Sequence, residues 1–235
     1  MSKGSLYLIP SLMGGQDSSI IPDAVKSLVQ RLDIYIVENA KSARHFLRHI
    51  GFKGPFDRIE MLELNKRTDP AEMYHFLDAC EEGKDIGLIS EAGAPAIADP
   101  GAEIVSLAHL KGIRVHPMTG PSSVMLALMA SGLNGQQFSF HGYLPIDSKA
   151  RQHRIKLLEQ QSAAWRQSQI FMEAPYRNKA LLADILKVCY PDTKLCIAAN
   201  LTLSNEFIRT RSIAEWKRQT PELHKKPAIF ILLKF

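Results

Sequence analysis

"DIGLISEAGAPAIADPGAEIVSLAHLKGIRVHP" (residues 85–117) contains, in order, an apolar strand pattern, a loop of small residues, a helix pattern and a second strand pattern. Strands that alternate with helices are typical of α/β proteins with a parallel sheet. The loop "SEAGAPAIADPG" (Ser90–Gly101) is longer and less polar than an ordinary surface connection. Its small residues let a ligand approach the backbone, and its prolines reduce the freedom lost on ordering. We therefore expect this loop to hold a ligand.

The same alternation extends through the first half of the chain. Strand patterns occur at residues 5–9 and 33–38, and helix patterns at 22–32, 40–50 and 68–83. Prolines in the first turn and glycines after the last turn support these helix bounds. The first half is therefore predicted to be a mainly parallel sheet with helices on its faces.

The prolines and the glycine of "HPMTGPSS" (residues 116–123) interrupt this alternation. We place a domain boundary there, which gives an N-terminal α/β domain at residues 1–117 and a C-terminal domain at 118–235. The C-terminal half has helix patterns at 122–132, 149–161 and 178–190, and strand patterns at 137–143, 169–175, 195–200, 206–211 and 228–235. Its last strands are closely spaced, which predicts a mixed, partly antiparallel sheet.

Composition favours a globular cytoplasmic protein. The chain has 235 residues, of which 46% are hydrophobic, and no apolar run approaches the roughly 18 residues of a membrane span. The three cysteines lack metal-binding spacing and are expected to be reduced. The formal net charge of +5 permits an anionic partner without requiring one.

Common signatures of nucleotide, metal and hydrolase sites are missing. Neither GxxxxGK[ST] nor GxGxxG nor GxSxG occurs in the chain. His45 and His49 lie four residues apart on one predicted helix, but without HExxH they indicate a basic face, and we expect no metal site.

Four restricted segments instead share a position in the predicted topology. Pro10, the Ser90–Glu91 pair and "FMEAPYR" (Phe171–Arg177) each end a strand, and "TGPSS" (Thr119–Ser123) begins a helix. Ligands of open α/β sheets bind at the carboxyl ends of strands. Each segment alone is better explained as a cap or a turn, but together they predict a ligand cleft between the two domains.

These segments resemble a known family. "SEAGAPAIADPG" is similar to the "SDAGTPxxSDPG" loop of the tetrapyrrole methylase-like family of S-adenosylmethionine-dependent methyltransferases, and "EAPYR" is similar to its "ESPHR". "VEN" (Val37–Asn39), "GPSS" and "GYLP" (Gly142–Pro145) extend the resemblance over nearly the whole chain. The members that it resembles most methylate a ribose 2′-hydroxyl of ribosomal RNA.

The resemblance implies that S-adenosylmethionine lies between two α/β domains. Carried over position by position, it implies the cofactor-binding residues Pro10, Ser90, Glu91, Ala92, Ile97, Ser122, Ser123 and Met172. The two serines at the start of a helix are suited to the cofactor carboxylate, which the helix dipole also favours.

The acceptor side departs from the family pattern. The family's "EDTR" is "ENAK" here, with Asn39 in place of an aspartate, and its "ARELTK" is "AANLTL". The polar residues expected nearest the acceptor are Asn65, Lys66 and Arg177, with Glu38 and Glu173 as the possible general bases. A mutual ion pair of Glu173 and Arg177 that braces the turn is an equally good interpretation.

Three functions remain compatible with these residues. The first is 2′-O-methylation of ribosomal RNA, free or within the small ribosomal subunit, by a divergent family member. The second is methylation of a tetrapyrrole or another small molecule, and the third is a non-catalytic S-adenosylmethionine-binding module. The resemblance also implies a homodimer, because apolar positions of "FSFHGYLP" look exposed and two-fold assembly is common.

Overall fold

The computed structural model describes residues 2–65 and 67–235, which form two compact units that divide between Ser122 and Ser123. The expected boundary lies a few residues earlier, after residue 117. The intervening segment stays with the first unit because the Met118 N–H donates to the Leu8 carbonyl at 3.0 Å. Each unit has its own sheet and its own hydrophobic core, so each is described separately.

The first unit contains a five-stranded parallel sheet over the described residues, in the order β3-β2-β4-β1-β5. Its strands are β1 (Ser5–Ile9), β2 (Ile34–Val37), β3 (Glu60–Glu63), β4 (Ile86–Ile89) and β5 (Arg114–Pro117). Its helices are α1 (Asp23–Leu28), α2 (Ala40–His49), α3 (Pro70–Tyr74), α4 (Asp78–Glu81) and α5 (Gly101–Leu110).

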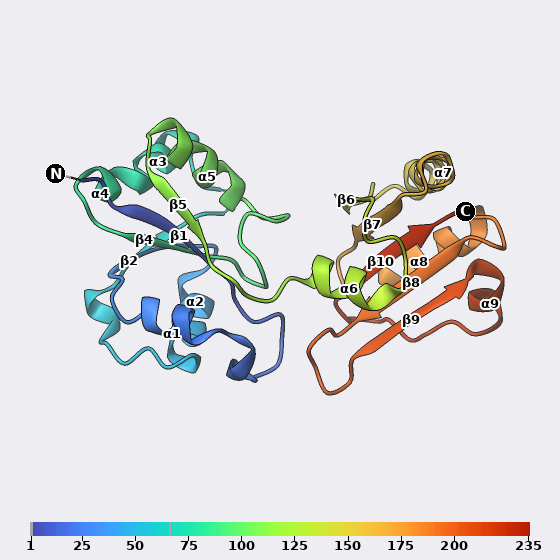
Figure 1. Ribbon diagram of the computed structural model, residues 1–235, viewed down its shortest axis with the longest axis horizontal. Helices are drawn as coiled ribbons and strands as arrows, with labels where there is room; N and C mark the ends of the chain where they lie inside the picture. The colour runs from blue at the N-terminus through green and yellow to red at the C-terminus, as the bar shows by residue number, and fades with distance from the viewer. Residues whose placement is uncertain (1, 66) are drawn as a thin grey trace. The chain divides into compact units, whose positions relative to one another are not determined.

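Helices cover both faces of this sheet. α1 and α2 lie on one face, and α3, α4 and α5 lie on the other (Figure 1). The first face buries Ile9 and Ile89 in one apolar cluster, whereas the second buries Leu6 and Leu88 in another. Successive side chains of a strand point to opposite faces, so a sheet covered on both sides needs strands that are apolar throughout. The burial of every residue of β2 and β4 fits this requirement.

The structure differs from the sequence expectation at two places in this unit. β3 has no counterpart among the predicted strands, because its sequence "EMLE" is polar at both ends and the strand lies at the edge of the sheet. The predicted helix at 68–83 is divided into α3 and α4 by a 3-10 turn at His75–Leu77. Its beginning is as expected: the Asp69 side chain caps α3 by accepting from the Ala71 N–H at 2.8 Å.

The second unit contains a mixed sheet in the order β6-β7-β10-β8-β9. Its strands are β6 (Phe138–Tyr143), β7 (Ser168–Met172), β8 (Lys194–Ala199), β9 (Phe207–Ser212) and β10 (Ala228–Leu233). Its helices are α6 (Ser123–Ser131), α7 (Ser148–Trp165), α8 (Asn178–Val188) and α9 (Ile213–Arg218). β6 and β7 are parallel, whereas β10 is antiparallel to β7 and β8. The predicted fold class, a parallel sheet followed by a mixed one, is confirmed.

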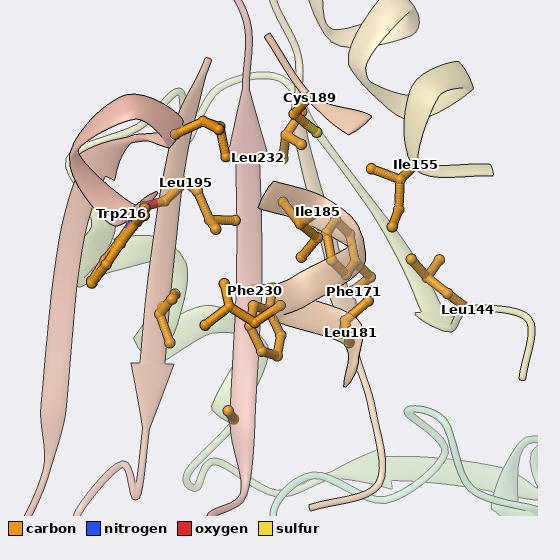
Figure 2. Close-up of a cluster of buried hydrophobic side chains, with 14 of the residues drawn as sticks. Leu144, Ile155, Phe171, Leu181, Ile185, Cys189, Leu195, Trp216, Phe230 and Leu232 are labelled. Atoms are coloured by element: carbon orange, nitrogen blue, oxygen red, sulfur yellow. The ribbon is translucent and has the colours of Figure 1, made fainter. Parts of the chain in front are cut away.

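One apolar cluster forms the core of the second unit (Figure 2). Phe171 of β7 and Phe230 of β10 stack with ring centroids 6.1 Å apart. The indole N–H of Trp216 donates to the Leu195 carbonyl at 2.8 Å, so this fully buried ring leaves no unpaired donor. α7, α8 and α9 contribute to this cluster, and α6 contacts β8, β9 and β10 without entering it.

Among the described residues, no helix has the length and apolar character needed to cross a membrane.

Candidate cofactor and acceptor site

The loops that follow β1 and β4 are joined at the carboxyl edge of the first sheet. Pro10 is buried directly after β1, and Ser11 exchanges two backbone hydrogen bonds with Gly93, at 2.9 and 3.2 Å. The Ser90 hydroxyl, which follows β4, donates to the Gly93 carbonyl at 3.0 Å. The loops after β1 and β4, which are distant in sequence, are thus joined at Gly93, whose φ of 75° belongs to the left-handed region.

The remainder of the Ser90–Gly101 loop is organised by one carboxylate. Asp99 accepts hydrogen bonds from the Ala96 N–H at 2.9 and 3.0 Å and from the Gly101 N–H at 2.8 Å. Ala96 and Ala98 both adopt left-handed φ angles, 65° and 62°, which are unusual for residues with a Cβ. Backbone strain of this kind persists only where the surroundings fix it, and it clusters at functional sites.

Two of the apolar residues that the sequence predicts to bind the cofactor lie exposed on this fixed loop. Ala92 is exposed, and Ile97 is 51% exposed. A rigid loop that presents small and apolar side chains to solvent is suited to a ligand with an apolar part.

Carboxylates gather next to this loop. Glu38, which follows β2, accepts from the Glu91 N–H at 3.4 Å. Partial burial raises the pKa of Glu38, and the neighbouring negative charges of Asp99 and Glu91 raise it further. Burial likewise raises the pKa of Asp99. Glu91 itself is exposed and accepts from the Ser42 hydroxyl at 2.5 Å, which joins the loop to α2.

The segment that leads to α6 packs against Pro10. An ideal Cβ on Gly120 would lie 2.1 Å from Cγ of Pro10, so only glycine fits at this position. The predicted cofactor residues Ser122 and Ser123 follow at once, and Ser123 is the first residue of α6. Both serines are half-buried. In the first unit, the structure therefore brings Pro10, Ser90 and the end of the 119–122 segment to the same sheet edge.

The other predicted residues of the second unit lie at the end of β7. Met172 is its last residue, and the side chain of the next residue, Glu173, is fully buried. Glu173 accepts from an Arg177 guanidinium nitrogen at 2.5 Å and from the Ala174 N–H at 2.7 Å. The structure thus contains the ion pair that the sequence allowed. The second carboxylate oxygen of Glu173 is buried without a partner among the described residues.

Asn65 has a local structural role in the first unit. Its side-chain oxygen accepts from the Arg67 N–H at 2.9 Å, and its carbonyl accepts from the Thr68 N–H at 3.0 Å. Lys66, the other residue expected near the acceptor, lies outside the described residues.

A cavity of about 250 Å³ opens at the same edge of the first sheet. The loop after β1, helix α2 and the start of the Ser90–Gly101 loop form its walls, which include Ser90 and Glu91. The sequence analysis missed this cavity and the role of Asp99, and it placed Ser11 only beside Pro10 at the end of the first strand. Aspartate is common in turns, so only the fold distinguishes Asp99. Within residues 2–65 and 67–235, no group of three or more His, Cys, Asp or Glu side chains could hold a metal ion.

The comparison with protein families identifies the family. The model of the tetrapyrrole (corrin/porphyrin) methylases matches residues 17–216. The chain belongs to the tetrapyrrole methylase family.

Relatives of this family member include ribosomal RNA small subunit methyltransferase I of Pseudomonas aeruginosa, 31% identical over 92% of this chain and 72% of the relative. The protein of the same name from Escherichia coli O157:H7 is 28% identical, over 98% of this chain and 78% of the relative.

Two solved structures share the fold. The methyltransferase CobJ has a TM-score of 0.65 at 14% identity and covers 98% of this chain and 94% of its own. The uroporphyrin-III C-methyltransferase of Thermus thermophilus, solved in complex with S-adenyl homocysteine, has a TM-score of 0.57 at 15% identity, over 98% of both chains.

Proposed function

We propose that this protein is an S-adenosylmethionine-dependent methyltransferase that methylates a ribose 2′-hydroxyl of ribosomal RNA. The observation that carries the proposal is the 31% identity with a ribosomal RNA small subunit methyltransferase over 92% of this chain. Its substrate is the RNA of the small ribosomal subunit.

The fixed loop after β4 supports the cofactor assignment. S-adenosylmethionine has an apolar and a polar part, and the loop offers exposed Ile97 beside backbone that Asp99 and Gly93 hold in place. Ser122 and Ser123 lie at the N-terminus of α6, where a carboxylate is favoured by about 0.3–1 kcal/mol. The proposed cofactor residues are Pro10, Ser90, Glu91, Ala92, Ile97, Ser122, Ser123 and Met172. When bound, the cofactor supplies an electrophilic methyl group.

Glu38 is the better of the two candidate bases. A ribose hydroxyl is a weak nucleophile at neutral pH, so removal of its proton assists attack. A general base works best when its pKa approaches the working pH, and burial with two neighbouring carboxylates raises the pKa of Glu38. Glu173 is instead paired with Arg177, so we assign this pair, together with Asn65 and Lys66, to positioning of the acceptor.

The test is methyl transfer from labelled S-adenosylmethionine to small ribosomal subunits, to naked ribosomal RNA and to a porphyrinogen. We expect label in RNA, at a linkage that resists alkaline hydrolysis because its 2′-oxygen is blocked. RNA binding should weaken steeply with salt, as phosphate contacts release counterions. Label in the porphyrinogen alone would replace the proposal with a small-molecule methyltransferase. If the protein binds the cofactor but transfers no methyl group to any acceptor, it is a non-catalytic binding module.

We also propose a cytoplasmic homodimer. On the edge strand β6, Phe138 and Tyr143 are 38% and 57% exposed, and Ile146 just beyond it is 70% exposed. Apolar side chains on a sheet edge are suited to a two-fold contact. Light scattering at micromolar concentration should give twice the chain mass, and a monomer mass would contradict the dimer.

A further inference from the structure

We infer that the cavity of the first unit holds one unpaired nucleotide of the RNA substrate, with its base against the rings of α2. This inference rests on the proposed function and locates the substrate within it. The cavity of about 250 Å³ is bounded by α2 on one side and by the loop after β1 on the other. Ligand pockets for drug-sized molecules measure about 300–1,000 Å³, so this cavity fits one nucleotide better than a macrocycle of four pyrrole rings.

Three aromatic rings from α2 line the cavity. They belong to His45, Phe46 and His49. The two imidazole rings stack with centroids 6.4 Å apart, and the His49 Nε2 atom lies 2.7 Å from the Gln16 carbonyl, which fixes its orientation. Proteins that recognise unpaired RNA bind its bases by stacking them on such rings.

The cavity also contains an unused polar group. Ser11 is only 3% exposed and lines the cavity, yet its hydroxyl has no hydrogen-bond partner among the described residues. Buried hydroxyls are nearly always paired, so an unpaired one that lines a cavity indicates a polar ligand. Its position is fixed, because the backbone of Ser11 pairs with Gly93.

The opposite wall gives the ligand access to bare backbone. Gly14 and Gly15 line it with left-handed φ angles of 125° and 70°, and both are exposed. A base or ribose can therefore approach N–H and C=O groups that no side chain covers. Glu91 lines the cavity as well, and its carboxylate can accept a hydrogen bond from an exocyclic amino group.

The position of the cavity agrees with a methyl acceptor. Ser90 and Glu91 belong both to its lining and to the proposed cofactor loop. The sequence of α2, "AKSARHFLRH", contains no acidic residue, and its Lys41 and Arg44 are exposed. Neither side chain has an ion-pair partner in the part of the chain that the structure describes. They are suited to the phosphates that flank the bound nucleotide.

The experiment compares steady-state methylation of small ribosomal subunits by four variants. Ser11→Ala, Phe46→Leu and His45→Ala alter the cavity, and His109→Ala replaces an exposed helical histidine of the same unit as a matched control. Loss of one stacking partner typically weakens binding about 5- to 150-fold. We therefore expect KM for the subunit to rise at least fivefold in His45→Ala and Phe46→Leu. The KM of Ser11→Ala for the subunit should rise by a smaller factor.

Cofactor affinity by calorimetry and the melting temperature separate this effect from misfolding. His45 is exposed, so His45→Ala should have the same cofactor affinity and the same melting temperature as the His109→Ala control. If the wild-type enzyme methylates RNA but the cavity variants have the same KM as the control, the inference is wrong and the proposed function stands. A wild-type chain that transfers no methyl group to RNA would overturn the proposed function and the inference together.

Discussion

Gly120→Ala tests whether the close contact with Pro10 holds the segment that carries the two cofactor serines. The added Cβ would lie 2.1 Å from Cγ and 2.5 Å from Cβ of Pro10. Carbon atoms pack best at roughly 3.5–4.0 Å, so the two segments must separate by more than about 1 Å. The proline ring is rigid and buried after β1, so a rotamer change cannot relieve the clash.

Overpacking of this kind typically costs about 1–3 kcal/mol. For a chain of this size, 1 kcal/mol corresponds to roughly 2–4 °C in melting temperature, so we expect a decrease of about 2–12 °C. Because Ser122 and Ser123 follow directly, the affinity for S-adenosylmethionine should also fall, by roughly tenfold or more. Calorimetric titration and thermal unfolding of one preparation measure both effects.

The matched control is Gly135→Ala. A Cβ at Gly135 meets nothing within 4 Å, and neither Gly120 nor Gly135 has a left-handed φ. Both substitutions therefore add the same methyl group, and only the contact with Pro10 differs. If Gly120→Ala melts at the same temperature as Gly135→Ala and binds the cofactor as tightly as the wild type, the reasoning about this contact is wrong.

Three further outcomes are expected. Ala92→Val places two methyl groups on an exposed position, so the melting temperature should stay unchanged while cofactor affinity falls roughly 5- to 150-fold; a change in stability alone would show that the loop packs only against protein. Glu38→Gln should lower kcat by about 10²–10⁴-fold and raise the melting temperature at pH 7. Folding raises the pKa of Glu38, so the carboxylate reduces stability at neutral pH. The gain over wild type should therefore shrink as the pH falls through the raised pKa of the folded state and be absent below about 4, as unfolding at several pH values would reveal. Asp184 is nearly buried and accepts a 2.7 Å hydrogen bond from the Arg151 Nε, which Arg151→Ala removes. The free energy of unfolding in urea should therefore fall by about 3–5 kcal/mol. The double variant Arg151→Met/Asp184→Leu should recover much of this loss.

The predicted residues of the site differ in how far they could be located from the sequence. Pro10, Ser90 and Glu173 each follow a strand whose apolar pattern is clear, so their place at a sheet edge could be predicted from local periodicity. Ser11 could be placed in the same way beside Pro10, but the state of its hydroxyl could not, and Asp99 gave no such signal. The unpaired hydroxyl of the first and the three hydrogen bonds of the second depend on neighbours that the fold brings near.

By itself, the sequence determined the class of fold, the order of nearly all elements and the loop that marks the family. These properties depend on spacings of a few residues, which the chain displays directly. Tertiary structure alone decided that β3 pairs at the sheet edge, that Gly120 contacts Pro10, and that a cavity opens beside α2. It also decided that Glu38 shares its surroundings with Asp99 and Glu91. The physical reason is that burial, close contact and the charge around a carboxyl group depend on residues distant in sequence, and a local pattern carries no information about which of them will be neighbours.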